Sequence, residues 1–308
     1  MAKALVLKEG EIDVRSVVPI NRQSLRDKFR GYVRKPFSLI ALLLILAASC
    51  LTALAVAWII VYVFIQGIPY LKPEIFAWRW TYDNLSMMPS LINTLVIAAL
   101  SLLIAGVIGV FAAIFMVEYA KSTNPFVKAV RVAAETLSGI PSIVYGIFGM
   151  TFFVVLLGWG YCLLAGIITM AMMMLPLIMR TTEEALLAVP NSFREGSFAL
   201  GAGKLRTIFV IILPAAMPGI ISGIILGLGR VVGETMALVY TAGSAINVRY
   251  PAGLMSQGCT LTVYLYSLIT EGNKYAGQAW AVAVVLIVLV VLINGLAEFI
   301  GNKLKKEY

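Results

Sequence analysis

Long apolar runs alternate with short polar segments along the chain, and their lengths predict six helices that cross a membrane. A helix needs about 20 predominantly apolar residues to span the hydrocarbon core of a bilayer. Three of the runs meet this requirement without interruption, at about residues 37–65, 91–117 and 280–300. Gly67 and Pro69 mark the end of the first run, because neither residue favours a continuing helix.

Two longer apolar regions have to be divided before they can be assigned to helices. Residues 132–179 are apolar except for Glu135, which makes the stretch too long for one span. The Gly-Trp-Gly segment at 158–160 supplies turn residues and an aromatic anchor, so it predicts a tight hairpin between spans three and four. The fifth run extends from about residue 208 to beyond Tyr240, and prolines, glycines and two charged residues interrupt it.

The composition narrows the class of protein. Of the 308 residues, 61% are hydrophobic and 13% are charged, whereas a soluble domain carries about a quarter charged residues. The chain has no histidine, which excludes histidine-based catalysis and imidazole metal ligands. Its three cysteines, Cys50, Cys162 and Cys259, have neither a disulfide framework nor a metal-site spacing. The methionines of span four favour adaptable packing, so we expect no metal site.

Lysines and arginines are concentrated in every second loop. The N-terminal segment holds nine of them, the loop after span two three, the loop after span four four, and the tail three. The three intervening loops hold only Lys72, Arg79, Arg249 and Lys274. Because basic loops stay on the cytoplasmic side, this alternation predicts six spans with both termini in the cytoplasm. We expect a cytoplasmic extension at 1–36, a transmembrane domain at 37–302 and a cytoplasmic tail at 303–308. The net charge of +9 therefore indicates membrane orientation and not nucleic-acid binding.

The cytoplasmic loop between spans four and five, about residues 181–207, carries a spaced motif. Glu195-Gly196-Ser197 is followed after three residues by Gly201, and after nine more by Ile-Ile-Leu-Pro. This spacing resembles the EAA loop of ABC-importer permeases, although small residues other than alanine follow the glutamate. The resemblance implies a short helix that sits in a cleft of an ATPase subunit and transmits its closure. The residues that would form this coupling helix and its turn are Arg194, Glu195, Gly196, Ser197 and Gly201.

The chain itself lacks a nucleotide-binding loop. Segment 201–204 reads Gly-Ala-Gly-Lys, but the earlier glycine and the following Ser or Thr of a phosphate-binding loop are missing. We therefore expect a non-catalytic subunit without a cofactor, whose partner ATPase binds ATP and Mg²⁺.

Three further segments resemble the permeases of phosphate ABC importers. They are Gly-Ile-Pro-Ser-Ile-Val-Tyr-Gly at 139–146, the stretch from Leu175 to Leu186 that includes Thr-Thr-Glu-Glu-Ala-Leu, and Gly-Arg-Val-Val-Gly-Glu-Thr at 229–235. The second is most similar to the PstA-type subunit, and the third is closer to the sister PstC-type subunit. The resemblance implies an all-α integral membrane protein with the type I ABC-importer permease fold, in a bacterial cytoplasmic membrane.

The same resemblance implies partners. They are a paralogous permease subunit, two ATPase subunits and an extracytoplasmic phosphate-binding protein, all assembled in membrane lipid. Two alternatives stay open: a permease for another oxyanion such as molybdate or sulfate, and an ion-coupled secondary transporter. The secondary transporter is disfavoured because we find no internal repeat and it gives the 181–207 motif no role.

Ionisable residues inside the predicted spans are the candidates for an anion pathway. Arg230 and Glu234 are four residues apart, so on one helix they would share a face and could pair. The planar guanidinium of Arg230 suits phosphate, yet a purely structural ion pair is about equally plausible. Arg180 ends span four, where a membrane anchor is more expected than a role in anion exit. Together with Thr235, these three residues form the candidate phosphate pathway.

Overall fold

The computed structural model describes residues 36–120, 124–245 and 250–304. Apart from Pro36, the predicted N-terminal extension lies outside the described residues, as does the tail beyond Leu304. The described residues form helices joined by turns and loops and contain no strand. Five helices are long and apolar enough to cross a membrane, and a bent pair of shorter helices makes a sixth candidate. This agrees with the predicted all-α membrane protein with six spans.

The chain divides into two compact units, Met1–Tyr62 and Val63–Tyr308. The first contains most of helix α2, Pro36–Gly67, which is apolar on all sides. Its 32 residues correspond to about 48 Å at 1.5 Å per residue, enough to cross a bilayer. No other described element of that unit covers this surface, so α2 has the character of a helix that faces lipid or another membrane helix.

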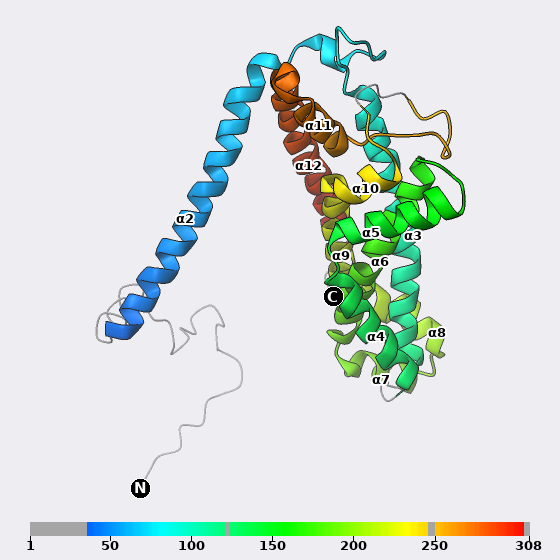
Figure 1. The fold of residues 1–308 in the computed structure, drawn as a ribbon. Helices are drawn as coiled ribbons and strands as arrows, with labels where there is room; N and C mark the ends of the chain where they lie inside the picture. The colour runs from blue at the N-terminus through cyan, green and yellow to red at the C-terminus, as the bar shows by residue number, and fades with distance from the viewer. Residues whose placement is uncertain (1–35, 121–123, 246–249, 305–308) are drawn as a thin grey trace. The chain divides into compact units, whose positions relative to one another are not determined.

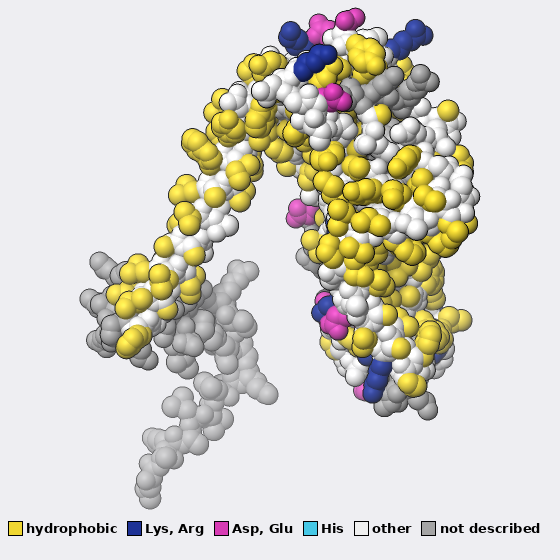
Figure 2. All heavy atoms as spheres, viewed as in Figure 1, with side chains coloured by type: hydrophobic (Ala, Val, Ile, Leu, Met, Phe, Trp, Pro, Cys, Tyr) yellow, Lys and Arg dark blue, Asp and Glu magenta, His cyan; other side chains and the backbone are white. Residues whose placement is uncertain are grey.

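The second unit is built around helix α6, Leu163–Leu187, which is the most buried of the candidate spans. Helices α3, Met88–Ile114, and α9, Leu213–Gly233, pack against it, and α12, Ala276–Leu304, packs against α9 (Figure 1). Charged side chains on the face shown in Figure 2 lie mostly at the two ends of this unit, with an apolar band between them. That distribution fits a protein whose middle is surrounded by hydrocarbon.

Glycines on α9 set the contact between α9 and α6. Gly219, Gly223 and Gly227 recur every four residues and therefore lie on one face of α9. A Cβ at these positions would overlap Ala185, Thr181 and the tip of Met174 on α6. Small residues allow membrane helices to approach closely and to gain van der Waals contact along their length.

Span three is broken, which corrects the prediction of one continuous helix there. Helix α4, Pro125–Ser138, is bent by 102° from the helix that starts at Ser142 and ends at Leu156. This second helix consists of α5, Ser142–Gly149, and a π-helical continuation, η4, Met150–Leu156. The break falls at Gly-Ile-Pro, residues 139–141, because Pro141 lacks an N–H and disfavours helical geometry in the residue before it.

The hairpin predicted between spans three and four is confirmed. Gly158 and Gly160 have φ angles of +68° and +69°, a left-handed conformation that glycine adopts without strain. The chain then enters α6 through Cys162, whose sulfur accepts a long hydrogen bond of 3.5 Å from the Ala165 N–H.

The fifth run is also broken. A short helix α8, Lys204–Thr207, and a π-helical turn η5, Ile208–Ile212, lead into α9, which ends at Gly233. The chain then forms a separate short helix α10, Met236–Thr241. Helix α10 packs on α5, where a Cβ at Gly146 would lie 2.9 Å from the Ala237 Cα. The two short helices that follow the two breaks therefore lie against each other (Figure 1).

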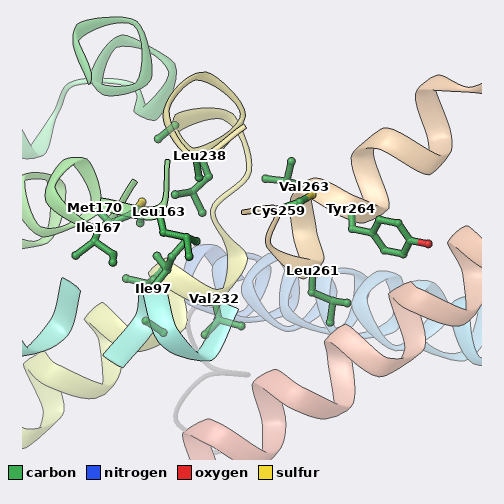
Figure 3. Packing of buried hydrophobic residues seen from close by; sticks show 14 of the residues in the cluster. Ile97, Leu163, Ile167, Met170, Val232, Leu238, Cys259, Leu261, Val263 and Tyr264 are labelled. Atoms are coloured by element: carbon green, nitrogen blue, oxygen red, sulfur yellow. The ribbon is translucent and has the colours of Figure 1, made fainter. Parts of the chain in front are cut away.

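A further helix, α11 at Leu261–Thr270, was not predicted because its apolar run is too short to span a bilayer. It completes the main core together with α3, α6, α9 and α10 (Figure 3). The labelled core side chains are Ile97, Leu163, Ile167, Met170, Val232, Leu238, Cys259, Leu261, Val263 and Tyr264.

The glycine contact leads to a stability prediction. We expect Gly223→Ala to lower the thermal midpoint of the detergent-purified chain, because the new methyl group overlaps Thr181; overpacking costs about 1–3 kcal/mol. Gly106→Ala on α3 is the matched control, since a Cβ there has open space. Equal midpoints for the two variants would contradict the close α6–α9 contact.

Candidate functional site

A short helix, α7 at Asn191–Ala199, lies where the coupling helix is predicted. Helix α6 extends through residues 181–187, so the first part of the predicted loop is helical, and Pro190 separates it from α7. The predicted turn is present at Gly201, whose φ of +78° favours glycine. Helix α8 then returns the chain toward α9.

The five candidate coupling residues do not share one face. Glu195 and Gly196 are exposed, and a Cβ at Gly196 would meet nothing within 4 Å. Ser197 faces inward, where its Oγ lies 2.8 Å from the Thr207 Oγ1. Arg194 also turns toward the protein. The outward-facing part of the motif is therefore Glu195-Gly196, and the inward-facing part holds α7 in place.

Large apolar side chains are exposed around this outward part. Leu200 is 90% exposed and Leu205 is 63% exposed, and Phe193 and Phe198 are each more than 40% exposed. An apolar patch at the charged, non-membrane end of a helical protein is typical of a protein–protein contact. The surface of α7 and α8 is thus suited to receive a partner.

Arg194 anchors α7 to two other elements. Its Nε and one terminal nitrogen donate to Glu118 Oε1 at 3.0 and 2.7 Å. Its terminal nitrogens also donate to the carbonyl oxygens of Leu186 and Val189 at 3.0 and 2.9 Å, and to Asn191 Oδ1 at 3.3 Å. The Arg194 and Glu118 side chains are only 16% and 9% exposed. Glu118 lies in the π-helical turn η3, Phe115–Tyr119, that ends α3.

Arg180 lies in a group of charged side chains contributed by α4 and α6. Its guanidinium is 3.1 Å from Glu184 and 3.6 Å from Glu135, and all three side chains are more than half exposed. Next to them, Arg131 donates to the largely buried Glu183 at 2.6 Å. These groups line a cleft of about 190 Å³. Arg180 is thus bound by two carboxylates, and its interpretation as a membrane anchor or as part of an anion exit stays a prediction.

The predicted Arg230–Glu234 pair is wrong. Helix α9 ends at Gly233, and Glu234 has extended backbone angles, so the two residues do not share a helical face. The Glu234 Oε1 instead accepts from the Ala237 N–H at 3.3 Å, at the start of α10. Among the described residues, Arg230 forms no ion pair or hydrogen bond, and its side chain is exposed.

Arg230 lies near the broken third span. It lies within electrostatic range of Tyr145 of α5, whose hydroxyl donates to the carbonyl oxygen of Leu137 near the end of α4. Arg180 lies at a different depth along the helices. Its neighbour Thr181 contacts Gly223 of α9, and Arg230 lies about 10 Å farther along α9 than Gly223, at 1.5 Å per residue. The four pathway candidates therefore form two groups at different depths and not one site.

A buried polar network holds the break after Arg230. Thr262 Oγ1 donates to the carbonyl oxygen of Glu234 at 2.7 Å, and the Leu261 N–H donates to Thr94 Oγ1 of α3 at 2.8 Å. Thr260 caps α11. Sequence analysis missed these threonines, since an isolated threonine carries no signal. Glu118 could have been noticed, because it is an acidic residue at the basic end of a span.

The fold is that of an ABC-importer permease. In solved structures, a chain of a bacterial alginate ABC transporter matches with a TM-score of 0.64 and 18% identity over 89% of this chain and 97% of that one. A chain of the MetNI methionine ABC transporter matches with a TM-score of 0.55 and 22% identity over 74% of this chain and all of that one. At these identities the likeness shows the fold alone.

The family follows from the sequence comparison. Residues 105–306 match the family described as binding-protein-dependent transport system inner membrane component, and the chain belongs to this family. It is 30% identical to the phosphate transport system permease protein PstA of Mycobacterium leprae, over 89% of this chain and 94% of that protein. It is 34% identical to the probable ABC transporter permease protein YqgI of Bacillus subtilis, over 70% and 78% of the two chains.

The network around Glu234 leads to a second prediction. Thr262→Val removes the hydroxyl that donates to the Glu234 carbonyl and should destabilise the purified chain by about 1 kcal/mol, whereas Thr262→Ser keeps the hydroxyl and should stay near wild type. Thr52→Val is the control, because that exposed hydroxyl bonds only within its own helix. The measurement is thermal unfolding in detergent, and a Val variant as stable as the Ser variant would refute the role.

Proposed function

We propose that this chain is a permease subunit of an ATP-driven importer and that its substrate is inorganic phosphate. The observation that carries the proposal is the match to PstA-named relatives at 30–36% identity, which covers 61–89% of this chain. The Arg230 guanidinium supports it, because it is exposed and has no carboxylate partner among the described residues. A guanidinium donates two parallel hydrogen bonds to a phosphate, which makes it a suitable oxyanion contact.

The chain acts with other subunits in this proposal. A second, paralogous permease forms the other half of the pathway, two ATPase subunits bind ATP and Mg²⁺, and an extracytoplasmic binding protein delivers phosphate. The exposed surface of α7 and α8, with Glu195, Gly196 and Leu200, receives the ATPase and passes on its closure. The permease carries out no chemical step, and it functions in the bacterial inner membrane.

Arg230 and Arg180 have different roles in this pathway. Among the described residues, Arg230 has no competing carboxylate within 4 Å, so it contacts the anion inside the membrane region. Arg180 is held between Glu135 and Glu184, and an anion that reaches it must compete with both carboxylates. Such competition lowers affinity at the cytoplasmic side and favours release.

A reconstituted system tests the function directly. Proteoliposomes that contain the permease pair, the ATPase and the binding protein should accumulate labelled phosphate only with ATP, and a proton ionophore should not prevent uptake. Unlabelled molybdate or sulfate should compete poorly. Preferred uptake of either oxyanion would overturn the phosphate assignment, and uptake driven by a proton or sodium gradient would indicate a secondary transporter.

The Arg230 contact has its own test. Arg230→Lys keeps the charge but loses the planar fork, so we expect phosphate uptake to fall by about tenfold, the loss that corresponds to one charge-assisted hydrogen bond. Lys128→Gln, on the exposed face of α4, is the control and should leave uptake unchanged. Wild-type uptake by Arg230→Lys would show that Arg230 is not a phosphate ligand.

A further inference from the structure

The π-helical turn η3 at the end of α3 is held by both halves of the coupling region. Arg194 of α7 reaches Glu118, and Lys204 of α8 places its Nζ 4.6 Å from the centre of the Tyr119 ring. These two neighbouring residues of one turn therefore contact the only two described helices between α6 and η5. No comparable pair of contacts from α7 and α8 is directed at the end of another span among the described residues.

Several hydrogen bonds hold the Arg194 side chain in a fixed orientation. Three of its nitrogens take part in hydrogen bonds to Glu118, Leu186 and Val189. Leu186 is in the last turn of α6, and its carbonyl oxygen accepts from the Val189 N–H at 3.4 Å as well as from Arg194. One guanidinium thus links α7, the end of α6 and the end of α3. A planar side chain with several fixed bonds resists rotation more than a single contact does.

The surroundings of Glu118 make the pair costly to separate. A cluster of buried apolar residues, separate from the main core, lies where α3 and α6 end and α9 begins. It includes Ile114, Met116, Val189, Ile208 and Ile212. Glu118 is 9% exposed beside this cluster, so its carboxylate depends on Arg194 for compensation. If α7 moved without η3, a nearly buried charge would lose its partner. Movement of α7 is therefore expected to carry η3 with it.

Close helix packing would carry such a movement further into the membrane. Gly109 of α3 lies against α6, where a Cβ would be 3.1 Å from Ile178 and 3.2 Å from the Met179 nitrogen. Gly223 of α9 meets Thr181 on α6. Tightly packed helices transmit displacement because their interiors are hardly compressible. A pull on η3 thus acts on α3, α6 and α9 together.

We propose that the Arg194–Glu118 pair connects the coupling helix to the membrane helices, so that ATPase closure moves the end of α3 through this pair. Arg194 and Glu118 are positioning residues here and do not contact the transported anion. The inference rests on the proposed function, because it assigns a part within an ATP-driven permease. Lys204 and Tyr119 add a second, weaker contact from α8, since both side chains are exposed.

The test separates coupling from stability. In proteoliposomes of the whole complex, phosphate transported per ATP hydrolysed is measured for wild type, Glu118→Gln and Arg194→Lys. We expect this ratio to fall by about fivefold or more in both variants, with the ATPase subunits still co-purifying in wild-type amounts. Glu298→Gln, an exposed acidic residue near the inner end of α12 without an ion pair among the described residues, is the control and should keep the wild-type ratio.

A purely structural role gives a different pattern. Uptake and ATP hydrolysis would then fall together with the amount of assembled complex, and an unchanged ratio would overturn the inference. Should Glu118→Gln fail to assemble, Arg194→Lys decides alone, because it retains the charge while losing most of the hydrogen bonds. If the wild-type complex carries another oxyanion, the amount of that anion transported per ATP hydrolysed is measured instead. A wrong substrate and a wrong role for the Arg194–Glu118 pair therefore remain distinguishable.

Discussion

The close approach of α9 to α6 is the contact on which the rest of this structure depends. Three glycines at four-residue spacing leave room on one face of α9, and the side chains of Ala185, Thr181 and Met174 on α6 pack directly against them. Lipid tails are as apolar as leucine, so burial of apolar area does not favour helix association inside a membrane. Close packing of α6 side chains against the glycines of α9 favours the association instead. This contact fixes the relative heights of Thr181 and Gly223, and with them the levels at which Arg180 and Arg230 lie.

The two broken helices follow a second constraint of the membrane. Backbone N–H and C=O groups that leave a helix at membrane depth must find partners within the protein. At the break after Gly233, Thr262 bonds to the Glu234 carbonyl, and the Glu234 carboxylate bonds to the Ala237 N–H. At the break before α5, Tyr145 bonds to the Leu137 carbonyl. Because Gly146 lets α10 pack on α5, the two breaks support each other, and Arg230 lies within electrostatic range of Tyr145 at one of them.

Much of the fold could be predicted from run length and loop charge, because both follow from the thickness and the asymmetry of a membrane. The hairpin at 158–160 was found because its turn needs glycine twice, and α7 because its motif has a fixed spacing. The break at Pro141 was visible in the sequence, but apolar residues on both sides of it concealed the bend. The Arg230–Glu234 pair failed for a related reason: the spacing of four assumes a continuous helix, and α9 ends between the two residues. Glu118, the charged partner of Arg194, lies 76 residues away in the sequence, so a local pattern could not reveal the pair.

Three arginines show why the surroundings of a charge decide its use. Arg194 is nearly buried and bonded to a carboxylate and two helix-end carbonyls, so moving it alone is costly. Arg180 is exposed and shared between two carboxylates, an arrangement that solvent screens and an anion can enter by competition. Arg230 has neither kind of partner among the described residues. A side chain fixed by several bonds, such as Arg194, can transmit a displacement, and one paired with two exposed carboxylates, such as Arg180, can exchange partners. An unpaired charge within a span, such as Arg230, attracts an anion or a partner chain. The same side chain is thus suited to the three tasks proposed for it, because burial and neighbours differ at each position.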